Sequence, residues 1–427
     1  MITSFENELQ KGTGLAFLLL KKSILTPSDA IDKIIFDNLA TNFAYDPQCE
    51  GSRHEYIYNM VQFYPRKQHI YSMVLNHFEK MTLDDYGARQ IFGFVEKLVE
   101  EKVVSKEKLY EKFLYYASKD IYPYMLGVEE LILADDIEGI VFIARYFGKN
   151  ITEKNHSDFA GLPFFDGFSK KIGLSSKEVL KILKEKQDPD IERFLSVITL
   201  KCPKQQSNIV RESATELVEK LRKGRSYLVR KWLRTANVAE IQELSRLFKY
   251  EKNLDVRKKL LIGFRHIKID VPLEYLISEF VKTRDVLYRE SLVDAMLLFG
   301  DDSVLKLCDK AYSKVFRVTW IKACSVFYND SYAWRLRLEL EELDHNEIHE
   351  VLKSIIRSSA LAKASIYHSL LRILYRKNRC SICRRDIVQR IIETGSYDLN
   401  FIEEIKHDCD EDIRKFANEA KLTNVSA

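Results

Sequence analysis

The sequence predicts an all-α protein, an α-α superhelix of stacked helical hairpins with an irregular helical N-terminal part. Three observations predict this fold class. Apolar residues in the second half are spaced by three and four positions, which places them on one stripe of a helix. Helix breakers are few, with 15 Gly and 8 Pro among 427 residues. A basic residue also recurs at intervals of 27, 32 and 28 residues, at Arg230, Arg257, Arg289 and Arg317.

The repeat is visible in the apolar positions of two helices per unit. In the leading helix, the set Ile241, Leu244, Phe248 recurs as Leu273, Leu276, Phe280 and then as Val304, Leu307, Ala311. In the following helix, the set Val256, Leu260, Leu261, Phe264 recurs as Tyr288, Leu292, Val293, Met296 and then as Phe316, Trp320, Ile321, Cys324. One hairpin has too little interior to fold alone, so its stripe must pack against the next hairpin. We therefore expect Leu276, Phe280, Leu292 and Trp320 to be buried between successive hairpins.

Short acidic and basic motifs stand at the start of several of these helices. They are Asp255-Val256-Arg257, the related stretch from Asp285 to Arg289, and Asp412 to Arg414. On these residues the chain resembles HEAT and armadillo-type repeat proteins, most clearly over about residues 200 to 345. The resemblance implies that the Asp and Arg side chains form a ladder between successive repeats, so Arg257 and Arg289 are expected to bond mainly to neighbouring repeats. Proteins of this kind bind partners from proteins to nucleic acids, so the resemblance implies an architecture and leaves the ligand open.

The chain is expected to have three parts. Residues 1–150 form an N-terminal helical domain, 151–175 a connecting loop, and 176–420 the HEAT-like repeat region. The loop is predicted by Gly161, Pro163 and Gly167, which interrupt any helix and stand among three phenylalanines, Phe164, Phe165 and Phe168. Helices of the N-terminal domain are predicted at about 28–40, 52–63, 67–80, 83–103, 105–118 and 136–148.

Composition indicates a soluble cytoplasmic protein. The seven Cys are odd in number and scattered, as expected of reduced thiols in a cytosol. No apolar stretch approaches the roughly 20 residues that a membrane helix needs, so no membrane contact is expected. No motif implies a cofactor.

Positive charge is concentrated in two segments, although the formal net charge is only +4. Residues 201–270 hold 18 Lys or Arg against 8 Asp or Glu, and residues 351–385 hold nine basic residues and no acidic one. Such a surface suits phosphates or acidic protein faces. Aromatic residues Tyr227, Trp232 and Tyr250 lie in the first segment, where they are candidates for stacking on bases. The predicted partner-binding residues are Lys223, Arg225, Arg230, Lys231, Arg234, Lys258 and Lys259.

A cysteine pair near the C-terminal end allows more than one interpretation. Cys380 and Cys383 have the spacing of zinc ligands, and His407 and Cys409 are the available second half of a zinc site. Residues two apart on a helix point in different directions, which makes that second half a poor one. Flanking arginines and a helix start favour a reactive thiolate instead. The interpretation we adopt is a structural cap with buried thiols and no metal.

The function that these observations favour is that of a non-enzymatic scaffold or adaptor that binds a protein partner on a concave face. The alternative is a nucleic-acid-binding repeat protein, with a basic segment over 201–270. That alternative includes the alkylated-base DNA glycosylases of HEAT-like fold, in which a Trp is followed one helical turn later by an Asp. Here Trp232, Trp320 and Trp334 are followed by other residues, namely Ala236, Cys324 and Leu338.

Overall fold

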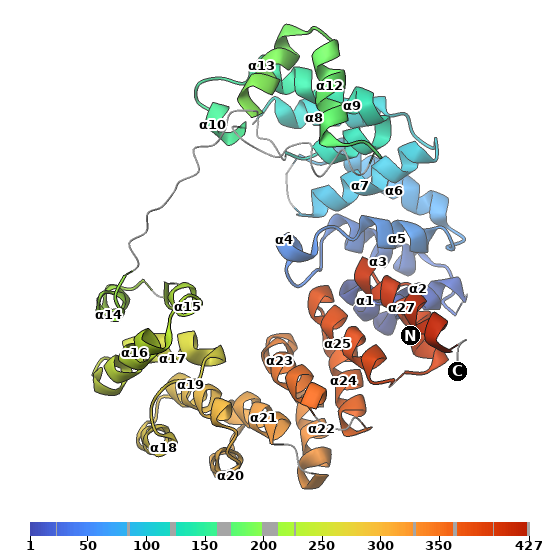
Figure 1. Cartoon of the computed structure of the whole chain (residues 1–427). Helices are drawn as coiled ribbons and strands as arrows, with labels where there is room; N and C mark the ends of the chain where they lie inside the picture. The colour runs from blue at the N-terminus through green and yellow to red at the C-terminus, as the bar shows by residue number, and fades with distance from the viewer. Residues whose placement is uncertain are drawn as a thin grey trace. The chain divides into compact units, whose positions relative to one another are not determined.

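All regular structure is helical in the computed structural model (Figure 1), which confirms the all-α prediction for the residues that the structure describes. None of the helices in this part of the chain is long and apolar enough to cross a membrane. The predicted loop phenylalanines Phe164, Phe165 and Phe168 lie outside the described residues. The structure describes residues 1–22, 24–82, 86–119, 125–159, 172–198, 212–225, 228–327, 330–361, 365–395 and 397–424.

The chain folds as two compact units. Unit 1 contains Met1–Gln206, Arg379–Arg385 and Asp398–Ala427, and unit 2 contains Ser207–Asn378 and Asp386–Tyr397. This division does not coincide with the predicted boundaries at 150 and 176. Two helices from the predicted repeat region, α12 and α13, belong to unit 1, because α13 packs along the long helix α9.

Unit 1 is organised around α7, which packs against α3, α5, α6, α8 and α9. Its inward residues, among them Phe92, Phe94 and Val95, are fully buried. The helices are α1 (Ile2–Lys11), α2 (Gly14–Lys21), α3 (Asp29–Ala40), α4 (Pro47–Glu50), α5 (His54–Val61), α6 (Lys67–Lys80), α7 (Tyr86–Glu100), α8 (Glu107–Ala117), α9 (Val128–Asn150), α10 (His156–Phe159), α12 (Ser176–Glu185), α13 (Pro189–Ile198), the first residues of α25 (Ser381–Glu393), α26 (Leu399–Ile405) and α27 (Glu411–Asn424).

A buried ionic cluster joins the late segments of the chain to the first helices within unit 1. The guanidinium of Arg384 donates to Asp408 Oδ1 at 3.0 Å, and both side chains are 0% exposed. Arg384 also donates to the carbonyl oxygens of Lys11 at 2.7 Å and Gly12 at 3.4 Å. Beside it, Cys409 N donates to the carbonyl of Gly12 at 2.9 Å. These bonds fix residues 379–385 and 398–427 against the turn between α1 and α2.

A second ion pair, between Arg53 and Glu50, extends this cluster. The two side chains are 6% and 1% exposed and lie 3.0 Å apart. Glu50 Oε2 also accepts from the backbone N of Ser381 at 2.8 Å, while Arg53 donates to the Gln10 carbonyl at 2.6 Å. Burial acts to raise the pKa of Glu50, but the Arg53 guanidinium and the backbone N–H of Ser381 hold it below its ordinary value.

Unit 2 consists of helices whose neighbours in space follow chain order. The second helices of the hairpins contact one another in series, since α15 packs on α17, α17 on α19, α19 on α21, and α21 on α23. Figure 1 shows them as one layer, with α16, α18, α20 and α22 as the other. The helices are α14 (Ala214–Arg222), α15 (Leu228–Leu233), α16 (Val238–Tyr250), α17 (Leu254–Gly263), α18 (Leu273–Lys282), α19 (Val286–Met296), α20 (Ser303–Lys310), α21 (Arg317–Val326), α22 (Ala333–Glu342), α23 (His345–Leu361) and α24 (Ser365–Lys377), with short 3₁₀ turns at Phe264–His266, Leu297–Phe299, Lys314–Phe316 and Asp330–Tyr332.

The predicted apolar stripes form the core of unit 2. Leu276, Phe280, Leu292 and Trp320 are at most 1% exposed, as expected. The alignment of the third leading helix was wrong by three positions, because Val304 and Cys308 are buried where Leu307 and Ala311 were expected. A short helix, α20, allows this shift because only Val304, Leu305 and Cys308 reach the core.

The expected arginine ladder is present at two of its positions. Arg257 donates to Glu279 Oε2 at 2.6 Å and to the Tyr275 hydroxyl at 2.8 Å, both on the next hairpin. Arg317 pairs with Glu347 at 2.8 Å, again on the next hairpin. Arg289 differs, since its Nε donates to the Phe280 carbonyl at 3.3 Å within its own hairpin.

Candidate functional site

Five of the seven predicted partner-binding residues are exposed at one end of unit 2. Lys223 and Arg225 follow α14, Arg230 and Lys231 lie on α15, and Arg234 follows α15. Helix α15 is short and buries Val229, Trp232 and Leu233, while Arg230 and Lys231 between them face solvent. None of these five cations has a side-chain hydrogen bond or ion pair to another residue that the structure describes. Their charges are available to a ligand.

The other two predicted residues are engaged within the fold. Lys258 Nζ pairs with Asp285 Oδ2 at 2.9 Å and with Asp255 Oδ1 at 3.4 Å. Lys259 Nζ donates to the Leu221 carbonyl at 3.4 Å. Both side chains bridge neighbouring helices, and neither is exposed. The inclusion of Lys258 and Lys259 in an open basic surface was therefore wrong, because both face adjacent hairpins.

Further cations surround His266, at the end of α17. The pKa of His266 lies below its ordinary value because of desolvation and, after that, because of the positive charges of Arg265, Arg230, Lys353 and Arg357. Arg230 lies on α15, Arg265 and His266 lie in the 3₁₀ turn after α17, and Lys353 and Arg357 lie on α23, so they belong to the layer of second helices in unit 2. Lys353 and Arg357 are exposed, and no ion pair joins either to another described residue. We call His266 and these four residues the cation cluster.

Acidic residues lie next to the cation cluster and partly balance it. Asp294 accepts from Arg265 Nε at 3.2 Å and from Lys322 Nζ at 3.3 Å. Glu290 is half-buried, and desolvation raises its pKa, opposed by the charge of Lys322. The layer of second helices thus has paired charges at its centre on α19 and α21, and on α15 and α23 it has cations that pair with no other described residue.

The sequence had indicated part of this cluster without assigning it. Lys353 and Arg357 fall in the run of basic residues over 351–385, which was not connected with the first basic segment. The two segments are about a hundred residues apart in the sequence, and periodicity reports only local structure. Residues of both segments lie near His266 because of the number of hairpins between the segments.

The aromatic residues proposed for base stacking are not all available. The indole of Trp232 is 7% exposed, and its Nε1 donates to the Glu212 carbonyl at 2.7 Å. Tyr250 is 68% exposed. Lys249 Nζ lies over its ring, 6.0 Å from the centroid. Tyr227 lies outside the described residues.

The four residues of the possible zinc site lie in unit 1. Cys380 and Cys383 are buried, their Sγ atoms lie within 4.8 Å of each other, and Cys383 N donates to Cys380 Sγ at 3.5 Å. Bonds from Cys383 lower the pKa of Cys380 to about 7, with burial opposing them. The ring of His407 instead stacks on Phe17 with centroids 4.1 Å apart, and Arg384 donates to Cys409 Sγ at 3.5 Å. Within the described part of the chain, His407 and Cys409 do not join the cysteine pair in a group with metal-ligand spacing.

We expect the purified protein to contain no stoichiometric zinc. Within unit 1, the thiols of Cys380 and Cys383 alone leave a tetrahedral zinc ion with half of its ligands missing, and Cys409 already accepts a hydrogen bond from Arg384. Metal analysis of the full chain by mass spectrometry checks this, with Cys383→Ser as the comparison. About one equivalent of zinc in the wild type that disappears in Cys383→Ser would contradict the expectation.

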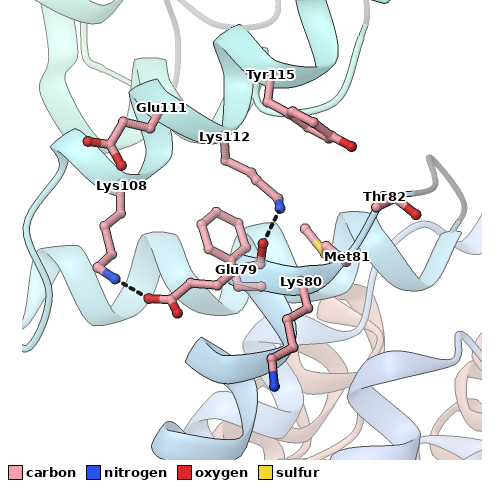
Figure 2. Close-up of a pocket in the computed structure, with 9 residues that line it drawn as sticks. Glu79, Lys80, Met81, Thr82, Lys108, Glu111, Lys112 and Tyr115 are labelled. Carbon is pink, nitrogen blue, oxygen red and sulfur yellow. Dashed lines mark hydrogen bonds and ion pairs between the residues drawn. The ribbon is translucent and has the colours of Figure 1, made fainter.

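A separate pocket of about 410 Å³ lies between α6 and α8 (Figure 2). Lys108 pairs with Glu79, and Lys112 Nζ donates to the Glu79 carbonyl at 3.0 Å. Lys112 also lies over the rings of Phe78 and Tyr115, and burial lowers its pKa. The charged groups at the centre of this pocket are hydrogen-bonded to other residues of the pocket, so the pocket presents paired polar groups rather than reactive ones.

The comparisons with known proteins add no family. The chain matches no protein-family model, no curated protein and no solved structure. The interpretation of its surfaces therefore depends on their own geometry.

Proposed function

We propose that this chain is a non-enzymatic α-solenoid of the HEAT type, a scaffold that binds a protein partner along a concave face of unit 2. The face consists of the second helices α15, α17, α19, α21 and α23. The partner presents an acidic surface. The observation that carries the proposal is the set of exposed cations on α15 and α23 that have no carboxylate partner among the described residues.

The packing of unit 2 supports the solenoid. Each second helix contacts the next one in chain order, and Arg257 and Arg317 each bond to the following hairpin. A stack of this kind places equivalent positions of successive hairpins on one continuous surface. Cations at such positions act together on an extended acidic partner, and complementary charge raises the association rate.

The alternative is a nucleic-acid-binding repeat protein. Arg225, Arg230, Lys231 and Arg234 lie within ten residues and are all exposed, an arrangement that suits a phosphate backbone. Trp232 does not support it, because its indole is buried. The DNA glycosylase form of this alternative has no added support, since Trp320 is buried in the core.

Reversing Lys223, Arg225, Arg230 and Lys231 to Glu is expected to weaken binding of acidic ligands while leaving the helices intact. All four side chains are exposed and make no described contact that folding needs. Two probes, poly-glutamate and a random-sequence DNA duplex, are measured for association rate and affinity at 50 and 200 mM salt. For a protein scaffold, the reversal mainly slows association with poly-glutamate. For a nucleic-acid-binding protein, duplex affinity falls steeply with salt, and each lost phosphate contact reduces that slope by about one unit.

A matched control reverses four exposed lysines of unit 1, namely Lys177, Lys181, Lys184 and Lys186. The change in net charge is the same, so any effect of overall charge appears in both variants. If the control loses binding as the test variant does, or if the test variant binds both probes as the wild type does, the cations of unit 2 are solvated side chains and the proposal fails.

A further inference from the structure

The cysteine pair at the start of α25 takes no part in the function proposed for unit 2. Both residues belong to the segment Arg379–Arg385 of unit 1. The six cysteines that the structure describes are all reduced. The Sγ atoms of Cys380 and Cys383 lie within 4.8 Å of each other, so local side-chain movement brings them to bonding distance. A disulfide between them therefore requires no rearrangement of other elements.

Cys380 is the capping residue at the N-terminus of α25. Its carbonyl accepts from the backbone N of Arg384 at 3.0 Å, and its Sγ accepts from the backbone N of Cys383 at 3.5 Å. These are the two bonds of an N-capping residue, with sulfur in the place of the usual oxygen. The positive end of the helix dipole lies at this position and favours a negative charge on the sulfur. The start of α25 therefore favours the thiolate of Cys380, which is the nucleophilic form.

Cys383 reinforces this effect and sets Cys380 apart from other thiols of the chain. Hydrogen bonds from the Cys383 thiol and backbone lower the pKa of Cys380 to about 7, although burial acts in the opposite direction. Burial raises the pKa of Cys308 to about 12. A hydrogen bond with Asp46 raises the pKa of Cys49, although Cys49 is exposed. Near neutral pH, Cys380 therefore carries more thiolate than either of these two cysteines.

The backbone around Cys380 is held in place by other parts of unit 1. Glu50 Oε2 accepts from the backbone N of Ser381 at 2.8 Å. On the other side of Cys380, the carbonyl oxygen of Arg379 accepts from Arg53 at 3.4 Å. Both neighbours of Cys380 are thus fixed to the segment that contains α4 and the start of α5. An oxidised Cys380 therefore stays next to the second cysteine, which favours reaction between the two.

Burial limits the size of the oxidant that reaches the pair. Cys380 is 5% exposed and Cys383 is 7% exposed. A protein disulfide would have to place its own sulfur in line with a nearly covered Sγ atom, which this exposure disfavours. Hydrogen peroxide is much smaller, and it converts a thiolate that has a second thiol nearby into a disulfide. The geometry of the pair therefore favours a small two-electron oxidant.

We propose that Cys380 and Cys383 form a peroxide-sensitive dithiol, in which Cys380 reacts with a hydroperoxide and Cys383 then closes an intramolecular disulfide. In the first step, the sulfur of Cys380 attacks one oxygen of hydrogen peroxide. The S–O bond forms as the O–O bond breaks, and the departing hydroxide takes up the proton that Cys380 released. Cys380 is then a sulfenic acid.

In the second step, the sulfur of Cys383 attacks Sγ of the sulfenic acid. The S–S bond forms, the S–O bond breaks, and the hydroxide leaves as water with the thiol proton of Cys383. The two thiols lose two electrons in total, and the peroxide is reduced to two molecules of water. An external dithiol reverses the modification in two exchange steps, in which it is oxidised to its own disulfide.

The test treats the full chain, reduced and dialysed against EDTA, with a tenfold molar excess of hydrogen peroxide at pH 7. Remaining thiols are blocked with N-ethylmaleimide, and tryptic peptides are identified by mass spectrometry. The expected product is the peptide from Cys380 to Arg384 with both cysteines unlabelled and a mass lower by two hydrogen atoms. Dithiothreitol added before blocking is expected to restore both labels. Despite its exposure, Cys49 is expected to be oxidised at least about tenfold more slowly than Cys380.

Serine variants separate the roles of the two cysteines. Cys383→Ser removes the second thiol, so the sulfenic acid at Cys380 is expected to persist, and dimedone traps it at a level at least about tenfold above the wild type. Cys380→Ser is expected to form neither a disulfide nor a dimedone adduct at Cys383. Cys49→Ser is the matched control and behaves as the wild type.

Two measurements guard against a misfolded variant. Serine is a favoured residue at a helix N-cap, so Cys380→Ser is expected to keep the Tm of the wild type. In urea, the difference in oxidation rate between Cys380 and Cys49 is expected to disappear, because it depends on the folded start of α25.

The proposal is wrong if the native pair keeps both labels after peroxide treatment, if the disulfide joins Cys49 to either cysteine of the pair, or if Cys383→Ser forms no dimedone adduct. Charge reversal in unit 2 changes none of these residues. This proposal and the proposed function therefore fail independently.

Discussion

Replacing Arg384 with Met is expected to destabilise unit 1 by about 3–5 kcal/mol, because the substitution leaves the carboxylate of Asp408 buried without its partner. Both side chains of this pair are 0% exposed. The guanidinium also donates to the carbonyl oxygens of Lys11 and Gly12, and the substitution removes both bonds.

The neighbouring residue provides the control. Arg385 pairs with Asp412 at 2.9 Å, but the two side chains are 36% and 46% exposed. Arg385→Met should therefore change stability by less than about 1 kcal/mol. Chemical denaturation gives the free energies, and hydrogen exchange over residues 1–21 locates the effect. Equal losses in the two variants, or unchanged exchange in α1 and α2 of Arg384→Met, would show that the buried cluster does not hold these segments together.

Leu276→Ala is expected to cost unit 2 about 2–5 kcal/mol, because it creates a cavity in a packed stripe. Leu276 is 0% exposed on α18, a helix that packs against α19. Val281 lies on the same helix at 63% exposure, so Val281→Ala is the matched control, with an expected change within about 0.5 kcal/mol. Urea unfolding followed by circular dichroism measures both. A loss below about 1 kcal/mol for Leu276→Ala would mean that this stripe is not the core of the repeat.

Local periodicity predicted the second helices of unit 2 well. All twelve residues aligned there, from Val256 to Cys324, are buried. These helices contact hairpins on both sides, so burial selects apolar residues at every inward position. The leading helices have one such neighbour less, and the alignment of Leu307 and Ala311 failed in the shortest of them, α20.

The charged sites depended on information that a linear pattern does not contain. Glu96 stands in a segment rich in Glu and Lys that looks like a solvated helix face, yet its side chain is 0% exposed on α7, a helix that packs against α5 and α9. Likewise, Lys258 appeared to be part of a basic surface, but Asp285, from the next hairpin, neutralises it. In both cases the deciding neighbour comes from another element of the fold, at a distance along the chain that no local rule specifies.

The order of the segments in the chain also constrains biosynthesis. Unit 2 is inserted into the sequence of unit 1, whose first part ends at Gln206 and whose remaining parts begin at Arg379. During synthesis on the ribosome, the carbonyls of Lys11 and Gly12 therefore cannot bond to Arg384 until nearly all of unit 2 has been translated. At roughly 5–20 residues per second this delay lasts about 20–70 seconds. During that interval the surface of α2 that later receives α26 is exposed.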